Sequence, residues 1–200
     1  MSEIVQEKKK GKVLEGMGTP VKKLMLNQFG GAMLGIMLSS ATMQSDMLNF
    51  LTSILAIIFY LFLQYTAIWE IGAKDQIRVN GGRAAENKWQ GLRIALLANG
   101  LNILLGFLAV VLTTVGVLTQ WKWAGEGALI STVTARFWQG MYNGVINFII
   151  PANLKGVQTI LSSLIYFAII LPSLVVNTIG YRMGYLNRRI FPERKKRDKN

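Results

Sequence analysis

Four long apolar segments alternate with polar, charge-bearing segments along the chain. They cover approximately residues 24–43, 47–69, 94–119 and 159–180, and none of them contains Asp, Glu, Lys or Arg. Each is close to or longer than the roughly 20 residues that an α-helix needs to cross the hydrocarbon core of a bilayer. The pattern predicts an all-α integral membrane protein built on a bundle of about four transmembrane helices.

The polar segments divide the chain into parts. The predicted parts are a basic N-terminal segment (1–23), three spans with an intervening loop (24–119, loop 70–93), an outer segment (120–158), a last span (159–184) and a basic tail (185–200). The short connection between the first two spans predicts a tight helical turn around Ser45 and Asp46. Pro172 cannot donate a backbone hydrogen bond to Ala168, which predicts a kink in the fourth span.

The segment 120–158 has the pattern of neither a full span nor a simple loop. It contains two apolar stretches of only about ten residues, which are too short to cross a bilayer. Its aromatic residues suit the boundary with the lipid headgroups; they include Trp121, Trp123, Trp138 and Tyr142. The pattern favours short interfacial helices and leaves a re-entrant hairpin as the alternative. A full crossing is disfavoured by Arg136, Gly140 and Gly144.

Positive charge is concentrated on one side of the predicted bundle. The N-terminal segment carries six Lys, the loop between the second and third spans carries five Lys or Arg, and the C-terminal segment carries eight. The first hairpin has none, and 120–158 has three. The positive-inside rule therefore predicts that both termini are cytoplasmic. We expect a multi-pass protein of the cytoplasmic (inner) membrane of a bacterium.

The composition excludes several kinds of chemistry. The chain has no Cys and no His, which excludes disulfides, thiolate chemistry, zinc sites and imidazole catalysis. The ten carboxylates form no paired cluster with metal-ligand spacing, so we expect no enzyme activity, cofactor or metal. A net charge of +12 suggests nucleic-acid binding in a soluble protein. Here the charges flank spans and attract anionic lipid, so we expect no nucleic-acid partner.

Small and polar residues recur on one face of each predicted span. In the third span they follow one another at steps of three or four, which places them on one side of a helix. Lipid provides no hydrophobic drive for helix association, so such a face marks the side that packs or that lines a polar path. The candidates are Asn27, Gly31, Gly35, Gln64, Asn99, Asn102, Gly106 and Asn177. The pattern favours packing, since no carboxylate lies deep in a span to serve a proton relay.

The stretch "VNGGRAAENK" lies in the loop between the second and third spans. It lacks the GxxxxGK[ST] spacing of a phosphate-binding loop. We expect Gly81 and Gly82 to form a turn, followed by an amphipathic helix that leads into the third span. Phosphate binding at the start of that helix is the alternative. The candidate lipid headgroup contacts are Arg78, Arg83, Lys88 and Arg93.

A short internal similarity links the two spans that end on the basic side. Ile71-Gly72 and Ile179-Gly180 lie 108 residues apart, each where a span leaves the membrane. Duplication of a two-helix hairpin would produce such a match, but two residues do not establish one.

Three functions are compatible with this sequence, which is typical of small bacterial inner-membrane proteins. The favoured function is a non-enzymatic accessory or assembly subunit of a membrane complex, serving transport or export. One alternative is a small oligomeric channel or transporter lined by the polar helix faces. A second is an immunity or stress protein that binds lipid or peptide. The expected partners are anionic membrane lipids, with either further copies of the chain or a larger membrane protein.

Overall fold

The computed structural model describes residues 2–151 and 154–188, with side chains from residue 18 onward, and all regular structure in these residues is helical. The elements are α1 (Ser2–Ala41), α2 (Asp46–Asn80), α3 (Gln90–Ala98), α4 (Gly100–Thr119), α5 (Lys122–Trp138), the 3-10 helix η1 (Gly140–Tyr142), α6 (Asn143–Ile149), α7 (Val157–Ser163), α8 (Ile165–Ala168) and α9 (Leu171–Tyr185). Four stretches within the described residues are long and apolar enough to cross a membrane: Gly18–Ala41, Asp46–Asn80, Gly100–Thr119 and Val157–Tyr185. The predicted fold class, an all-α multi-pass membrane protein, is therefore confirmed.

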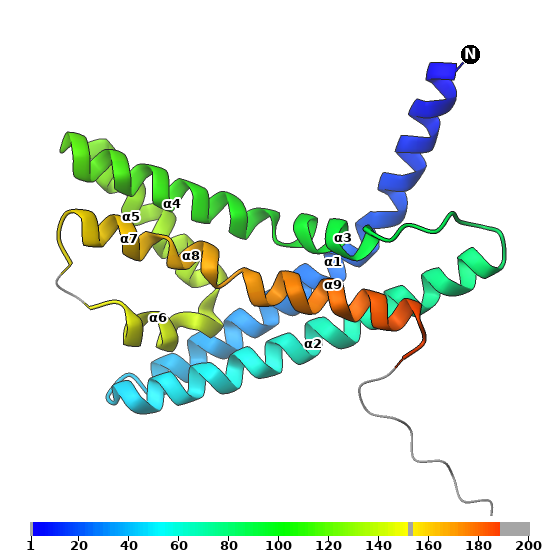
Figure 1. Cartoon of the computed structure of the whole chain (residues 1–200). Coiled ribbons are helices and arrows are strands. Elements are labelled where there is room, and N and C mark those ends of the chain that lie inside the picture. Colours follow the sequence, from blue (N-terminus) through cyan, green and yellow to red (C-terminus); the bar gives the residue numbers. More distant parts are fainter. Residues whose placement is uncertain (1, 152–153, 189–200) are drawn as a thin grey trace, which may run out of the picture.

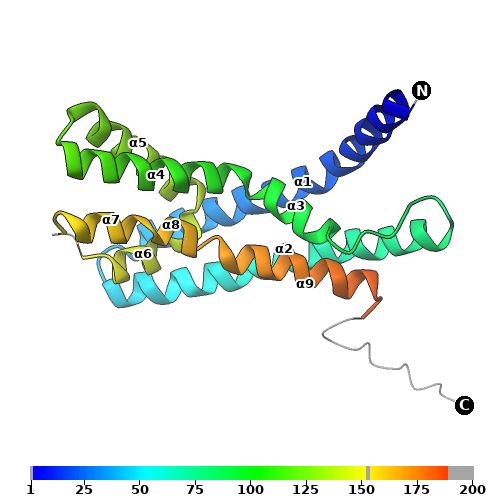
Figure 2. The same ribbon diagram turned by 45° about the horizontal axis from the view of Figure 1, so that its top comes forward.

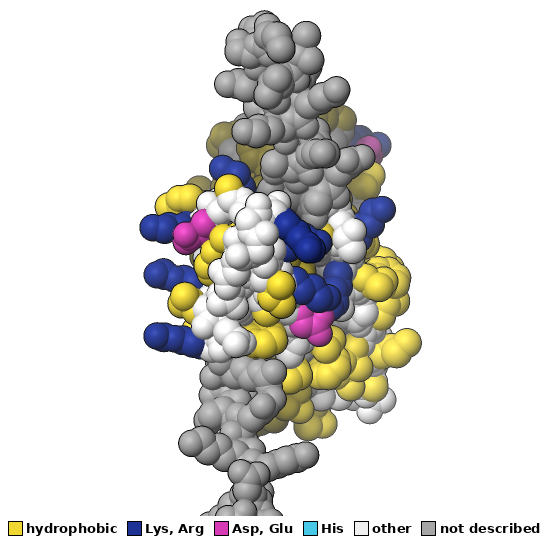
Figure 3. Space-filling view, turned by 90° about the vertical axis from the view of Figure 1, so that its right-hand side faces the viewer, with side chains coloured by type: hydrophobic (Ala, Val, Ile, Leu, Met, Phe, Trp, Pro, Cys, Tyr) yellow, Lys and Arg dark blue, Asp and Glu magenta, His cyan; other side chains and the backbone are white. Residues whose placement is uncertain are grey.

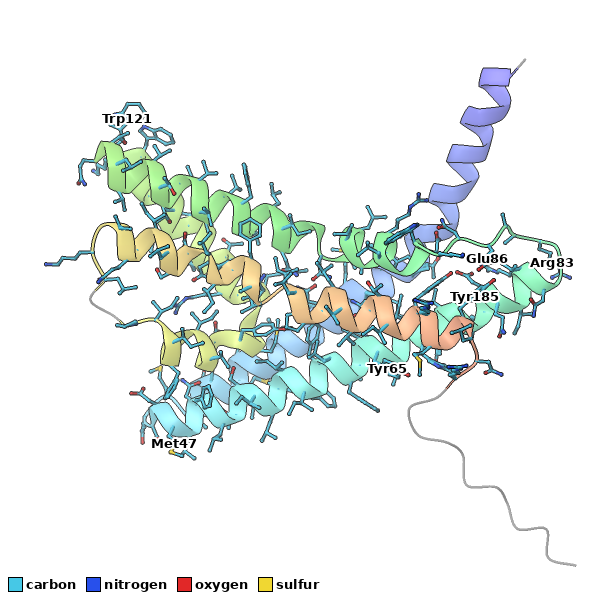
Figure 4. The ribbon with its side chains drawn as sticks, in the orientation of Figure 1. Met47, Tyr65, Arg83, Glu86, Trp121 and Tyr185 are labelled. Carbon is cyan, nitrogen blue, oxygen red and sulfur yellow. The ribbon has the colours of Figure 1, made fainter. Side chains whose placement is uncertain are left out.

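The bundle has two ends, which we name the turn end and the basic end. The turn end holds the connection between α1 and α2 (42–45) and the start of α5. The basic end holds the loop 81–89 between α2 and α3, together with the end of α9 (Figure 1). Figure 4 shows Trp121 at the turn end and Arg83 at the basic end. The charged loops therefore gather at one end, as the sequence indicates.

The α1–α2 connection is the tight turn that the sequence predicts. Ser45 is the N-cap of α2, with an extended backbone, and its hydroxyl accepts a hydrogen bond from the Leu48 amide. Asp46 places a carboxylate in the first turn of α2, where the helix dipole favours negative charge. Local capping chemistry thus fixes where the second span begins.

Close backbone contact joins α2 and α9 at the basic end. A Cβ atom added at Gly72 would meet the backbone carbonyl of Tyr181, and one added at Gly184 would meet that of Trp69. Gly180 also lies against α2. Glycine allows two backbones to approach this closely, and interhelical packing in lipid depends on such approach. Both glycines of the internal similarity, Gly72 and Gly180, belong to this contact, so packing accounts for them without duplication.

Residues 120–151 fold back along the bundle as a hairpin. From the turn end, α5 runs antiparallel to α4, η1 forms an elbow against α1 and α2, and α6 returns along α2 (Figures 1 and 2). The ring centroids of Phe50 and Phe148 are 4.6 Å apart, which places the end of α6 beside the start of α2. The elbow lies deeper, since the Ser53 hydroxyl donates to the Met141 carbonyl at 2.5 Å about two helical turns into α2.

The hairpin packs against the spans along its length, and the choice between interfacial helices and a re-entrant hairpin stays a prediction. The hairpin is held against the bundle by contacts that only glycine permits: a Cβ at Gly35 would meet the Met141 backbone, and one at Gly144 would meet the Asn49 backbone carbonyl. Hydropathy does not reveal such contacts, because they join residues that lie far apart in the sequence.

Two of the spans are interrupted inside the bundle, whereas the sequence predicts continuous helices. In the third span α3 and α4 meet at Asn99, whose side-chain amide donates to the Ala95 carbonyl at 2.9 Å. In the fourth, the helix is broken at Leu164 and again at Ile169 and Ile170. The second break precedes Pro172, which lacks the N–H that would continue the helical hydrogen bonds. The predicted kink is thus a local irregularity at Ile169 and Ile170, whose backbones remain right-handed helical.

The helix α2 continues to Asn80, through the first part of the predicted loop 70–93. Gly81 and Gly82 form the predicted turn, and Gly82 has φ +68°, a conformation that favours glycine. The amphipathic helix expected directly after this turn is absent, and α3 begins only at Gln90. The Asn87 side chain bonds to the Trp89 amide and to the Gln90 side chain, and this local bonding delays the start of the helix.

Gly35→Ala should destabilise the protein by roughly 1–3 kcal/mol, because its Cβ meets backbone atoms of the elbow that cannot rotate away. Gly30→Ala in the same helix is the matched control. A Cβ at Gly30 meets nothing within 4 Å, and alanine is the better helix former. Thermal unfolding of the purified protein in neutral detergent measures both variants. Equal midpoints for the two would show that the hairpin does not pack against α1 in this way.

Candidate functional site

A cluster of buried polar side chains lies where the two interrupted spans meet α2. This central polar cluster consists of Tyr60, Asn99, Asn102, Ser173 and Asn177, each at most 3% exposed. Ser173 is its common partner: the Ser173 Oγ lies 3.3 Å from the Asn99 Nδ2, 3.3 Å from the Asn177 Nδ2 and 3.1 Å from the Tyr60 hydroxyl. The Asn102 Nδ2 donates to the Asn99 Oδ1 at 3.0 Å. One hydroxyl thus connects α2, the α3–α4 break and the start of α9.

The cluster is polar but carries no formal charge. The buried Oδ1 atoms of Asn102 and Asn177 and the buried Oε1 of Gln64 accept no hydrogen bond from the described residues. Buried acceptors without donors are costly, and they are the groups that a polar solute or water would satisfy. The five side chains otherwise contact one another directly, so the cluster is closed in this conformation.

The sequence-derived candidates fall into three groups. Asn99, Asn102 and Asn177 meet in the central polar cluster. Asn27 and Gln64 instead join α1 to α2, since the Asn27 Nδ2 donates to the Leu63 carbonyl at 3.2 Å and the Gln64 Nε2 to the Leu24 carbonyl at 3.0 Å. The glycines make packing contacts: Gly31 against Tyr60, Gly35 against Met141 and Gly106 against Tyr166.

Three residues of interest stand outside that candidate list. The helical spacing of the sequence already places Tyr60 on the face of Gln64 and Ser173 on the face of Asn177, since each lies four residues before its candidate. Arg136 appears in the sequence only as an obstacle to a full crossing, whereas the structure places it inside the hairpin, hydrogen-bonded to two other helices.

The basic end carries the four candidate headgroup contacts, all of them exposed (Figure 3). Arg78 lies 3.4 Å from the Asp75 carboxylate. Arg83, Lys88 and Arg93 form no ion pair with any residue that the structure describes. Unpaired exposed cations next to a span attract anionic lipid headgroups. The arrangement is a charged surface and not an enclosed phosphate site.

No family model matches the chain, and no curated protein or solved structure is significantly similar to it. Within the described residues, no group of three or more Asp or Glu side chains is placed to hold a metal ion. The function is therefore inferred from the geometry of the polar sites.

Ser173→Ala should cost about 1–3 kcal/mol of unfolding free energy, because it removes the acceptor of the buried Asn177 amide and one of the two acceptors of the Asn99 amide. Ser162→Ala is the control, since the Ser162 hydroxyl bonds only to the Thr159 carbonyl within its own helix, and its loss should change stability by less than about 0.5 kcal/mol. Reversible unfolding in detergent compares the two. If Ser173→Ala leaves the unfolding free energy unchanged, the cluster does not depend on this hydroxyl.

Changing Arg83 and Lys88 together to Gln should lower the retention of anionic phospholipid roughly tenfold or more, at about 1 kcal/mol for each charge. Native mass spectrometry from anionic and zwitterionic mixtures gives the retained fraction. Lys122→Gln removes a charge at the turn end and should leave the retained fraction of anionic lipid unchanged. Unchanged retention in the double variant would contradict a headgroup role for the loop.

Proposed function

We propose that the protein is a small membrane transport protein, a channel or carrier that moves a polar solute past the central polar cluster. The observation that carries the proposal is the meeting of two interrupted spans at one buried contact, from the Asn99 Nδ2 to the Ser173 Oγ. Irregular backbone at membrane depth is tolerated where it is buried in protein or lines a polar path. Transporters use paired helix breaks of this kind to place backbone and amide groups around a solute.

The hairpin supports the same proposal. Its elbow reaches into the bundle from the turn end and contacts α1 and α2, while α5 lies on α4 and Arg136 bonds to Tyr166 of α8. The hairpin therefore touches every span and lies between the turn end and the deeper part of the bundle. In the proposed mechanism, a shift of the hairpin opens a path from the turn end toward the central polar cluster. No carboxylate takes part in the cluster, so proton coupling through it is not part of the proposal.

A second function, the accessory or assembly subunit, is favoured by a different observation. Every member of the central polar cluster is nearly inaccessible and contacts another member, as interhelical packing alone would produce. In that function the apolar outer faces of the helices would contact a larger membrane protein or further copies of the chain. The two functions differ in one measurable property, which is whether water ever reaches the cluster.

We further propose that the basic end faces the cytoplasm of a bacterial cell and that both termini lie on that side. The support is the uneven distribution of charge, with 19 of the 22 Lys and Arg in the three segments of that side.

Ser173→Cys should react with a cationic, membrane-impermeant thiosulfonate reagent, because a transport cycle exposes the central polar cluster to water. The chain has no cysteine, so each variant carries a single thiol. Labelling in membrane vesicles should be at least tenfold faster than for Leu104→Cys, which replaces a half-exposed residue on the lipid-facing side of α4. A rate no higher than that of Leu104→Cys would reject transport and favour the assembly subunit.

Two further single-cysteine variants test the proposed orientation of the protein in the membrane. Gln44→Cys lies in the turn between α1 and α2, and Arg83→Cys lies in the loop at the basic end, both exposed. In intact cells the reagent should label Gln44→Cys and not Arg83→Cys, and the reverse pattern would contradict the proposed orientation.

A further inference from the structure

Arg136 is a charged residue placed inside the hairpin among neutral partners. It belongs to the last turn of α5, and its side chain is partly buried. The Arg136 Nε donates to the Tyr166 hydroxyl of α8 at 3.1 Å, and the Nη1 donates to the Asn147 Oδ1 of α6 at 2.9 Å. The guanidinium is thus held in a fixed position by two helices other than its own.

No acidic residue that the structure describes neutralises this charge. The described carboxylates near the turn end are those of Asp46, which starts α2, and Glu126, which lies 3.8 Å from the Lys122 Nζ. The guanidinium has several N–H donors in a rigid fork, and its Nη2 group makes no hydrogen bond to the described residues. An arginine in a membrane-embedded segment with no counter-ion is costly, and such residues commonly mark a ligand site.

A second, independent observation comes from the elbow next to Arg136. Gln139 is 2% exposed, yet neither its Nε2 nor its Oε1 has a hydrogen-bond partner in the described part of the chain. The Trp138 Nε1 and the Tyr142 hydroxyl are also buried without partners. Gln139 is the C-cap of α5, three residues after Arg136. The elbow that begins there therefore holds buried polar groups without hydrogen-bond partners among the described residues.

We propose that Arg136 and the elbow form a binding site for a phosphate group, carried either by a phospholipid of the turn-end leaflet or by a water-soluble phosphate compound. A guanidinium fork binds phosphate oxygens in pairs, and the free Nη2 group of Arg136 is available for such a contact. The site can be reached, because Asn147 is exposed and Arg136 is only partly covered. With a soluble ligand, the site would recruit the solute at the turn end, and this part of the inference rests on the proposed transport function.

A purely structural role for Arg136 is the competing explanation, since its two hydrogen bonds already join α5, α6 and α8. The two roles differ in their response to a ligand. A structural residue stabilises the protein equally with and without phosphate, whereas a binding residue gives a saturable, phosphate-dependent stabilisation.

The experiment follows the unfolding midpoint of the full chain in uncharged maltoside detergent, by tryptophan fluorescence, at constant ionic strength. One arm titrates inorganic phosphate against chloride, and the other titrates a short-chain phosphatidylglycerol against the matching phosphatidylcholine. We expect a saturable rise in the midpoint in at least one arm. A rise with inorganic phosphate alone assigns a soluble ligand, a rise with the lipid alone assigns a headgroup, and a rise in both assigns the phosphate group itself.

Arg136→Gln should weaken the apparent affinity at least tenfold, and Lys122→Gln should leave it unchanged. Lys122 is the control because it is a cation of the same helix, lies at the turn end away from the elbow, and has a side chain that is 92% exposed. If Arg136→Gln fails to fold, Asn147→Asp provides the test. It places a carboxylate at the atom that already accepts from the guanidinium, so it should preserve the fold and weaken phosphate binding at least tenfold by supplying an internal counter-ion.

The proposal is overturned if the natural chain shows no saturable shift in either arm, or if Arg136→Gln or Asn147→Asp binds as tightly as the natural chain. The outcome is separate from that of the cysteine experiment. If phosphate binds but Ser173→Cys is not labelled, the protein has a phosphate site and does not transport. If Ser173→Cys is labelled but phosphate does not bind, the protein transports a different solute.

Discussion

Backbone groups that leave helical geometry inside a bilayer must find hydrogen-bond partners within the protein, because the hydrocarbon offers none. This chain departs from regular helix at the hairpin elbow and, more locally, at Asn99 and before Pro172. At the elbow a side chain of a span supplies a partner, since the Ser53 hydroxyl donates to the Met141 carbonyl. At Asn99 the backbone bond to the Ala95 carbonyl is kept, and the Asn99 side chain adds a second donor to that carbonyl.

Close approach of backbones is the second condition for this arrangement. The hairpin lies on α1 and α2 through Gly35 and Gly144, and α9 lies on α2 through Gly72 and Gly184. At the hairpin, this approach brings the Ser53 hydroxyl of α2 within reach of the Met141 carbonyl. Small residues thus set the distance between the helices, and serine and asparagine side chains form hydrogen bonds across that distance.

The polar groups that remain without partners are unevenly distributed. Within the described residues they lie mainly at the elbow, and a smaller set lies at and beside the central polar cluster. Elsewhere the asparagine and glutamine side chains that join α1 to α2 donate to backbone carbonyls. The proposed phosphate site and transport path coincide with the two regions where bonding is incomplete, which are also the regions where the helices are broken.

The sequence alone determined the spans, the tight turn at Ser45 and the gathering of charge at one end, because each follows from local hydropathy, capping or charge. It also placed Asn99, Asn102 and Asn177 on inward faces through their helical spacing. Only the tertiary structure decided that 120–151 folds back as a hairpin, because contacts with distant parts of the chain hold it in place. The Ser53 hydroxyl, for example, bonds to residues 88 and 92 positions later in the sequence. The tertiary structure also decided that one hydroxyl, Ser173, joins three helices, since no local pattern specifies which distant side chains share an acceptor.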